Sequence, residues 1–262
     1  MPHYSRRAVE PGHSSFVIRM PEQLWFTELL NRLFAGPVDR LLHGLGIRPA
    51  YPQAPITNSV AMQILVAAFL IVFFALVRSR LSADNPGSLQ HVVEGLESFI
   101  KDQSQQIIGP HSEGYTAFLV SLGLFILICN LIGLIPGFDS PTAVPSVPLG
   151  CAIIAFFYYH AQGIRKSGIA YLKHFAGPFW WLAVLMVPIE IISHLARVLS
   201  LTVRLFANMF AGDMVTLVFF SLIPIGVPIV FLGLHLGVSL LQTYIFVLLT
   251  TVYLQGAVGE EH

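Results

Sequence analysis

Long apolar segments alternate with polar segments along the chain, and this pattern predicts about five membrane-embedded helices. An apolar helix of about 20 residues spans a hydrocarbon core of about 30 Å, and polar or proline-containing stretches separate such helices. The predicted spans are residues 60–77, 115–135, 149–162, 179–223 and 229–255. The pattern indicates an all-α polytopic membrane protein, in which a polar leader, residues 1–58, precedes a single membrane domain, residues 59–262.

Two polar segments carry apolar residues at helical spacing and predict amphipathic helices that lie on the membrane surface. The first segment begins near Leu24 and is expected to end at Gly36-Pro37, where the pattern stops. The second segment, between Leu89 and Ile100, places its apolar residues on one face and its charged residues elsewhere around the helix. These charges make an interfacial position more favourable than a span.

The last two predicted spans are longer than a perpendicular crossing requires. Residues 189–223, between Pro188 and Pro224, would extend about 52 Å as one helix, and residues 229–255 would extend about 40 Å. A helix of this length must tilt strongly or break to fit the bilayer. We therefore expect two long tilted helices that form a hairpin, with its turn at residues 224–228.

The composition requires lipid rather than water around most of the surface. Apolar residues make up 55% of the chain and charged residues 11%, whereas a soluble domain carries about 25% charged residues. The net charge is zero, which gives no general attraction to nucleic acid. The two cysteines, Cys129 and Cys151, lie in apolar runs and form no CxxC motif, so neither a metal site nor a cofactor is predicted.

The distribution of basic residues predicts the orientation of the chain in the membrane. The loop between the second and third spans contains no Lys or Arg, whereas Lys101, Arg165, Lys166 and Lys173 flank these two spans at their other ends. Because basic residues stay on the cytoplasmic side, this loop is expected outside. Alternating spans then place the N-terminus outside and the C-terminus in the cytoplasm.

Ionisable residues within the last two spans point to an ion pathway. A charge at the bilayer centre costs at least ~2.5–3.5 kcal/mol, so such residues mark ion paths by default. The charged and polar residues of the fourth span are Glu190, His194, Arg197, Ser200, Arg204, Asn208 and Asp213, and those of the fifth are His235, Ser239 and Gln242. At about 100° per residue, most of the first set follow one line along the helix, while Asp213 points away from it.

The predicted hairpin gathers these residues into two clusters. Folding at the turn places Asp213 within one helical turn of His235, and these two form an outer cluster. Glu190 and His194 form an inner cluster towards the other end of the hairpin. Arg204 lies between the two clusters, so a permanent cation separates them.

This arrangement suits a proton path in two halves that never join. Carboxylates and imidazoles can relay protons, whereas a guanidinium cannot lose its proton and repels other cations. Arg204, predicted about one turn from Gln242, would therefore block a continuous leak while attracting any carboxylate brought to it. The chain places no carboxylate of its own to do this, so a partner must supply one.

Four of these residues also have a purely structural explanation. Arg197 could extend to the cytoplasmic headgroups, and Glu190 could be an acid at the start of a helix. His194 could pack in the core, and Arg204 could form a structural ion pair. Because Arg204 lies mid-helix among apolar residues, it is the hardest of the four to explain without a function.

One segment of the fourth span resembles the signature helix of subunit a of the F-type ATP synthase. The segment is Ser200-Leu-Thr-Val-Arg204-Leu-Phe-Ala-Asn208-Met-Phe-Ala-Gly212-Asp213. Further matches are Pro188-Ile-Glu190, Leu241-Gln242-Thr-Tyr-Ile-Phe246, Cys129-Asn130-Leu-Ile-Gly-Leu-Ile-Pro136 and the terminal Glu260-Glu261-His262. The resemblance covers roughly residues 57–262.

The resemblance implies a non-catalytic stator subunit that carries protons to and from a ring of c subunits, whose carboxylates pass an essential arginine as the ring turns. It identifies that arginine with Arg204. The residues that match the outer half-channel are Asp213, His235 and Gln242, with Asn208 near the arginine, and those that match the cytoplasmic half-channel are Glu190 and Ser200. His194 and Arg197 are assigned to the cytoplasmic half-channel only because they lie on the same line along the helix as Glu190.

The implied partners are the c-ring, the b-subunit peripheral stalk, the rest of the F1Fo ATP synthase and the lipid bilayer, with no nucleic acid and no cofactor. The implied location is the bacterial plasma (inner) membrane. The sequence departs from the family at two places. Some relatives carry an acid where this chain has Gly133, so the outer path must be lined otherwise. Val144-Pro145 interrupts the family's loop motif, and the resemblance therefore gives this loop no ion-path role.

Other classes of function remain as alternatives: an unrelated ion transporter or channel, the membrane anchor of a redox complex, or an intramembrane hydrolase. Transporters usually contain internal repeats, and none is found between the two halves. His160 and His174 have a spacing that could suit a pair of haem ligands, but Arg165, Lys166 and Gly168 between them argue against one buried helix. Neither HExxH nor GxSxG occurs, which disfavours a hydrolase.

Overall fold

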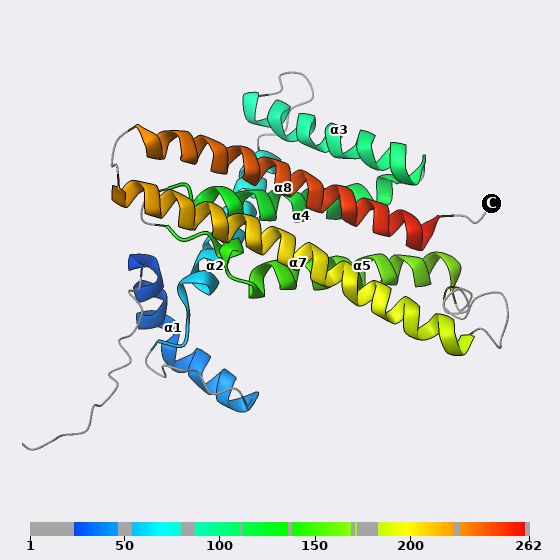
Figure 1. Ribbon diagram of the computed structural model, residues 1–262, viewed down its shortest axis with the longest axis horizontal. Helices are drawn as coiled ribbons and strands as arrows, with labels where there is room; N and C mark the ends of the chain where they lie inside the picture. The colour runs from blue at the N-terminus through cyan, green and yellow to red at the C-terminus, as the bar shows by residue number, and fades with distance from the viewer. Residues whose placement is uncertain are drawn as a thin grey trace, which may run out of the picture. The chain divides into compact units, whose positions relative to one another are not determined.

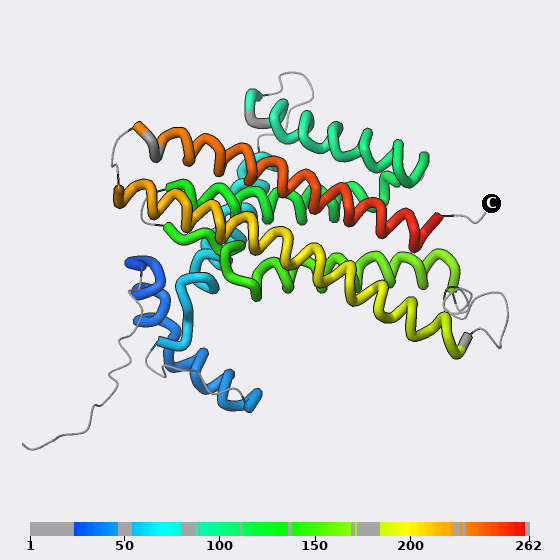
Figure 2. Tube along the Cα trace, viewed as in Figure 1, coloured from blue at the N-terminus to red at the C-terminus, as the bar shows by residue number. Residues whose placement is uncertain are grey.

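The computed structural model describes residues 24–46, 54–79, 87–110, 112–135, 138–168, 171, 183–222 and 226–259 of the chain. Within these ranges all regular structure is helical (Figure 1, Figure 2). The helices are α1 (Trp25–Gly44), α2 (Asn58–Ser79), α3 (Ser88–Ile108), α4 (Glu113–Ile132), α5 (Ser146–Ser167), α7 (Ala183–Leu222) and α8 (Val227–Val258), with the short 3-10 helix η1 (Pro141–Ala143) between α4 and α5. The predicted all-α class is confirmed.

The chain divides into two compact units, Met1–Pro55 and Ile56–His262. Five described helices of the second unit, α2, α4, α5, α7 and α8, are long and apolar enough to cross a membrane. This result confirms the predicted multi-pass membrane protein. Both predicted amphipathic segments are also helical, as α1 in the first unit and α3 in the second.

Helix α1 does not end where the sequence pattern stops. It continues past Pro37, which lies inside the helix, so the predicted end at that proline is wrong. A proline removes one backbone hydrogen bond but leaves the flanking turns able to form theirs. Ion pairs at i,i+4 spacing lie on both sides of it, Glu28 with Arg32 at 2.6 Å and Asp39 with His43 at 3.5 Å. Such pairs favour helix on each side of the proline.

Helix α5 is longer at both ends than the predicted span, residues 149–162. It begins at Ser146, because Pro148 falls in the first turn, where backbone N–H groups have no helical partner in any case. It ends at Ser167, where Gly168 adopts φ +59° and its N–H bonds to the carbonyl of Ile164 at 2.7 Å. The last turn carries Arg165 and Lys166, whose long side chains can reach polar headgroups from a helix end.

Helices α7 and α8 form the predicted hairpin and pack along each other (Figure 1). They contain 40 and 32 residues, which correspond to about 60 Å and about 48 Å of helix. Helix α7 begins at Ala183, within the predicted span of residues 179–223, and includes Pro188. Residues 179–182 and 223–225 of the predicted span and turn lie outside the described residues. In the described part of the turn, Gly226 adopts φ +88°, a conformation that favours glycine.

The core of the second unit lies where α4, α5, α7 and α8 meet. Leu201, Leu205 and Met209 of α7 follow one another at i,i+4 spacing and are almost fully buried in it, together with Phe246 of α8. Arg204 precedes Leu205 by one residue and therefore points about 100° away from this buried row. The packing of α7 thus fixes which of its residues face away from the core.

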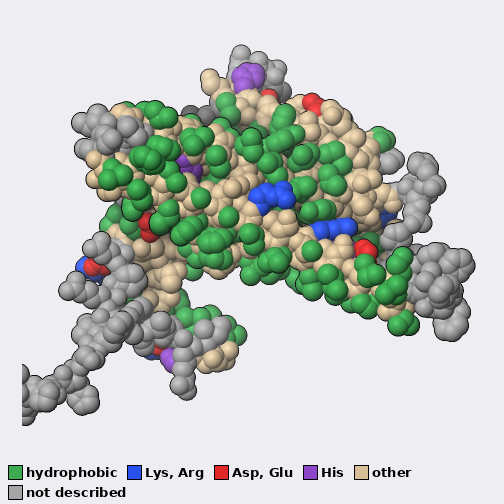
Figure 3. Space-filling model, in the orientation of Figure 1, with side chains coloured by type: hydrophobic (Ala, Val, Ile, Leu, Met, Phe, Trp, Pro, Cys, Tyr) green, Lys and Arg blue, Asp and Glu red, His purple; other side chains and the backbone are tan. Residues whose placement is uncertain are grey.

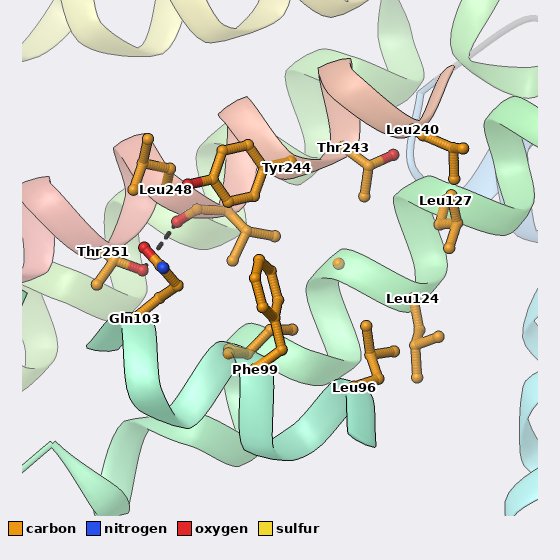
Figure 4. Close-up of a pocket in the computed structure, with 13 residues that line it drawn as sticks. Leu96, Phe99, Gln103, Leu124, Leu127, Leu240, Thr243, Tyr244, Leu248 and Thr251 are labelled. Carbon is orange, nitrogen blue, oxygen red and sulfur yellow. Dashed lines mark hydrogen bonds between the residues drawn. The ribbon is translucent and has the colours of Figure 1, made fainter. Parts of the chain in front are cut away.

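Helix α3 covers one side of α4 and α8, and Figure 4 shows the space between these three helices. The cavity there has a volume of about 190 Å³ and is lined mainly by apolar side chains. The ring of Phe99 on α3 lies 5.9 Å from that of Tyr244 on α8, measured between centroids. The Thr251 hydroxyl at the cavity wall donates to the carbonyl of Val247 at 2.9 Å. The amphipathic face of α3 therefore packs onto the helix bundle.

Candidate functional site

The outer cluster predicted from the hairpin is present in the structure. Asp213 Oδ1 of α7 lies 3.7 Å from His235 Nδ1 of α8. The His235 side chain is 3% exposed, whereas that of Asp213 is 26% exposed, so the pair leads from the partly open surface into the interior. A titratable carboxylate and a titratable imidazole are thereby held beside each other within a membrane-spanning hairpin.

Gly212 lets the His235 ring approach the backbone of α7. A Cβ atom at this position would lie 3.1 Å from three atoms of the ring, closer than an ordinary van der Waals contact. The glycine is therefore required here for close packing. Gly212 lies in the family-like segment, but its sequence context alone did not indicate this packing role.

We expect Gly212→Ala to displace the His235 ring and to slow proton transport roughly threefold, since a reacting group that is misplaced by a fraction of an ångström transfers its proton more slowly. ATP-driven acidification of inverted vesicles that contain equal amounts of assembled complex would measure the effect. The matched control is Gly150→Ala in α5, where an added Cβ meets no atom within 4 Å. Equal rates in the two variants would show that the fit of Gly212 to His235 is unimportant.

A cavity of about 240 Å³ adjoins the outer cluster between α7 and α8. Its polar lining comes from Asn208, Thr216 and His235, and the remainder is apolar or glycine. Among the described residues, His235 Nε2 and Thr216 Oγ1 are buried without a hydrogen-bond partner. Water enters a buried cavity that offers polar partners and room, and one water occupies about 30 Å³ of liquid. The cavity thus has the size and the unpaired polar atoms to hold several waters.

Asn208 and Gln242 continue the polar path from this cavity towards Arg204. Asn208 Nδ2 donates to Gln242 Oε1 at 2.8 Å, and Gln242 is 1% exposed. Asn208 lies one helical turn from Arg204 along α7. Asn208 therefore links Gln242 of α8 to α7 at a position one helical turn from Arg204.

Arg204 is half-buried and donates from Nη2 to Ser200 Oγ at 3.2 Å. In the part of the chain that the structure describes, no carboxylate lies within ion-pair distance of its guanidinium. The neighbouring Leu199 and Val203 side chains are 63% and 50% exposed. A structural ion pair within the described chain therefore does not explain Arg204. Its charge is presented on an apolar face of α7.

The inner cluster is also present and is larger than predicted. His194 Nε2 lies 3.3 Å from Glu190 Oε1, and its Nδ1 lies 3.1 Å from the Tyr159 hydroxyl of α5. The ring of His160 lies 4.6 Å from that of His194, and His160 Nδ1 is 2.7 Å from the Tyr171 hydroxyl. Burial raises the pKa of the Tyr171 hydroxyl above its usual value, so this hydroxyl stays protonated and can donate to His160.

Tyr159, His160 and Tyr171 were not predicted as members of this cluster. The positions of Tyr159 and His160 at the end of the third span carry no signal of their own, because only the packing of α5 against α7 brings them to His194, and Tyr171 reaches the cluster through His160. Arg197 lies over the Tyr253 ring of α8, with its guanidinium carbon 5.2 Å from the ring centroid. This cation–π contact stabilises the hairpin between the inner cluster and Arg204.

A buried hydrogen-bond network joins α4, η1 and α8 and was also missed. Thr142 Oγ1 donates to Asn130 Oδ1 at 2.6 Å, and Asn130 Nδ2 donates to Thr243 Oγ1 at 3.1 Å. Ser140 Oγ donates to the carbonyl of Cys129 at 3.2 Å. The signal in the sequence was Asn130, a polar residue at the end of an apolar span. Its partners depend on how the loop folds back onto α4, which the sequence pattern does not specify.

Comparisons with known proteins agree with this architecture. Residues 60–255 match the family described as "ATP synthase A chain". The chain is 57% identical to ATP synthase subunit a of Koribacter versatilis over 244 residues, which cover 93% of this chain and all of that protein. It is 52% identical to the corresponding subunit of Solibacter usitatus over 235 residues, 89% of this chain and all of that protein. Subunit a 1 of Syntrophotalea carbinolica is 42% identical over 193 residues, 74% of this chain and 82% of that protein. The chain therefore belongs to the ATP synthase subunit a family.

Proposed function

We propose that this chain carries protons to and from the rotor of an ATP synthase through two half-channels that Arg204 separates. Membership of the subunit a family makes the chain a proton-translocating membrane subunit of that enzyme. The half-channels, and the residues within them, are the finer part of the proposal. The chain acts by moving ions and leaves ATP chemistry to other subunits.

The observation that carries the proposal is the position of Arg204, which forms no ion pair with any described carboxylate, between two polar clusters. On one side lie Asp213, His235 and the cavity that ends at Asn208. On the other side lie Glu190 and His194 with the tyrosines that surround them. Both clusters contain groups that can accept and release protons near neutral pH, whereas Arg204 cannot. A proton can thus travel within each half but not across the guanidinium.

Transfer of the proton from one half-channel to the other requires a carboxylate that a partner subunit supplies. In the synthesis direction a proton passes Asp213 and His235, crosses the cavity water and protonates the partner's carboxylate near Asn208. After the rotor has turned, the same carboxylate approaches Arg204 from the other side and releases its proton towards Glu190. The guanidinium favours the ionised carboxylate, which drives this release.

The exposed face of α7 supports a rotor partner at this place. In its most apolar window only 11% of α7 is buried within the chain. Leu195, Leu199, Val203 and Phe210 are exposed around Arg204 on this helix. Figure 3 shows one face of the molecule as largely hydrophobic, with few Lys and Arg side chains. An apolar surface that carries the Arg204 guanidinium suits a ring of c subunits that slides past in the membrane. The family resemblance adds the b-subunit stalk as a second partner.

The proposed location is the bacterial plasma (inner) membrane, with the N-terminus outside and the C-terminus in the cytoplasm. The basic last turn of α5, with Arg165 and Lys166, supports a cytoplasmic position for that end. The Lys166 ammonium also donates to the carbonyl of Val258 at 2.9 Å, which places the end of α8 on the same side. The outer cluster then opens to the outside and the inner cluster to the cytoplasm.

Cysteine accessibility tests the two half-channels. In a chain with Cys129→Ala and Cys151→Ala, which removes two buried thiols, we expect Thr216→Cys to react with a small water-soluble thiol reagent added from outside. We expect His194→Cys to react from the cytoplasmic side only. Right-side-out and inverted vesicles that contain the assembled complex supply the two sides. Reaction of either cysteine from both sides would overturn the separation at Arg204.

A further inference from the structure

Asp139 stands just before η1 in the segment that connects α4 and α5, close to the outer cluster. We propose that Asp139 is the proton-loading residue at the outer mouth, where it exchanges protons between bulk water and Asp213. The inference rests on the outer half-channel proposed above and adds a residue to which the family resemblance gave no role. It also answers how the outer path obtains an acid when Gly133 occupies the position used by some relatives.

The backbone geometry leaves no room for a side chain at residue 133 and fixes the position of residue 139 nearby. A Cβ atom on Gly133 would lie 2.7 Å from Ser140 Cβ and 3.2 Å from its Cα, so the chain folds back directly onto this glycine. The bond from Ser140 Oγ to the Cys129 carbonyl fixes that fold, as does the bond from Thr142 to Asn130. The residue next to Ser140 is therefore held at the end of α4.

Asp139 connects three elements of the second unit. Its Oδ2 accepts a hydrogen bond from Asn58 Nδ2 of α2 at 3.2 Å. Its carboxylate interacts electrostatically with that of Asp213 on α7, against which η1 packs. Among the described residues it forms no ion pair, so no basic group in this part of the chain neutralises it. Asp139 is thus a negative charge fixed beside the entry to the outer cluster.

Exposure decreases stepwise along the path that begins at this residue. Asp139 is exposed, the Asp213 side chain is 26% exposed, and the His235 side chain is 3% exposed. An exposed carboxylate meets water from many directions, whereas the partly buried Asp213 presents little surface to it. A fixed negative charge also raises the local concentration of cations, including hydronium, at the mouth. Asp139 therefore collects protons where Asp213 alone would collect them slowly.

The proposed proton transfer needs no reactant other than water. The Asp139 carboxylate takes a proton from water and becomes a carboxylic acid. It passes that proton through water to the Asp213 carboxylate and returns to its ionised form. In the reverse direction the same groups release a proton to the outside.

The test compares Asp139→Asn with the native chain in liposomes that contain the complete ATP synthase. The amide can still accept the bond from Asn58, so the local structure is preserved while the titratable proton is lost. ATP synthesis is driven by a potassium diffusion potential, and the compartment that faces the outer half-channel contains either dilute or concentrated buffer. With dilute buffer we expect a loss of roughly threefold to tenfold, less than the ~100-fold typical of a positioned acid–base group, because water still reaches Asp213 unaided.

Concentrated buffer should return Asp139→Asn to nearly the native rate, because mobile buffer molecules then deliver protons to Asp213. Asp139→Glu should retain the native rate in both buffers, as should the control Asp102→Asn on α3. A native rate for Asp139→Asn in dilute buffer would overturn the inference. If concentrated buffer does not restore the rate of ATP synthesis, Asp139 has a structural role, and this result would also overturn the inference. Asp213→Asn is measured in parallel, and if it remains active the outer half-channel itself fails, independently of Asp139.

Discussion

Replacing Arg204 with alanine is expected to abolish proton-driven ATP synthesis and ATP-driven pumping while the complex still assembles. The side chain donates one bond to Ser200 and forms no ion pair among the described residues, so its removal leaves no buried charge without a partner. What is lost is the positive charge that draws the rotor carboxylate and favours its ionised form. Removal of one such electrostatic group typically costs about 100-fold to 1,000-fold in rate. Acidification of inverted vesicles measures the loss.

The same variant should raise passive proton leak, which distinguishes a divider from a simple binding residue. Without the guanidinium, the cavity at Asn208 and the cytoplasmic half-channel are no longer separated by a fixed cation. Leak is measured in vesicles stripped of the ATP-hydrolysing subunits. Arg204→Lys retains the charge but can release its proton, so it should suppress leak better than it supports pumping. The matched control is Arg78→Ala at the exposed end of α2, which should behave as the native chain. Pumping at the native rate in Arg204→Ala would refute the proposed mechanism.

The hairpin and its register could be predicted from the sequence because two physical constraints act along it. The short turn near Gly226 limits how the two helices can pair, and the lipid environment forces their few polar residues towards each other. These constraints place Asp213 beside His235 and bring Gln242 within one turn of Arg204. The structure shows the contact of Asp213 with His235, and Gln242 of α8 is linked to α7 by the hydrogen bond from Asn208.

The contacts that could not be predicted join elements with no fixed register between them. Tyr159 meets His194 only because α5 packs against α7, and periodicity within one helix does not contain that information. Asn130 meets Thr142 only because the loop folds back over Gly133. The continuation of α1 past Pro37 was also missed. A proline weakens a helix locally, but neighbouring turns and tertiary packing decide whether the helix continues.

Asp213→Asn is expected to cause the second large loss, a decrease of about 100-fold in proton-driven ATP synthesis. The amide is close in size to the carboxylate and can accept a hydrogen bond from a protonated His235 Nδ1, so the hairpin should retain its packing. The amide cannot take up and release a proton, which removes the first acid inside the outer mouth. His235 would then lie beside a group that cannot exchange protons with it, although the cavity behind it is intact. The loss should therefore be one of rate, with assembly unchanged.

Two further variants separate a missing proton carrier from altered packing. Asp213→Glu retains the acid and should keep a substantial part of the rate, whereas Glu97→Gln, which removes an exposed acid on α3, should leave the rate unchanged. Passive leak should not rise in Asp213→Asn, because Arg204 still separates the two halves; this is the opposite of the result expected for Arg204→Ala. Rates near the native value in Asp213→Asn would remove Asp213 from the path without affecting the role of Arg204. A rise in leak with a loss of pumping would instead mean that Asp213, and not the arginine alone, keeps the two half-channels apart.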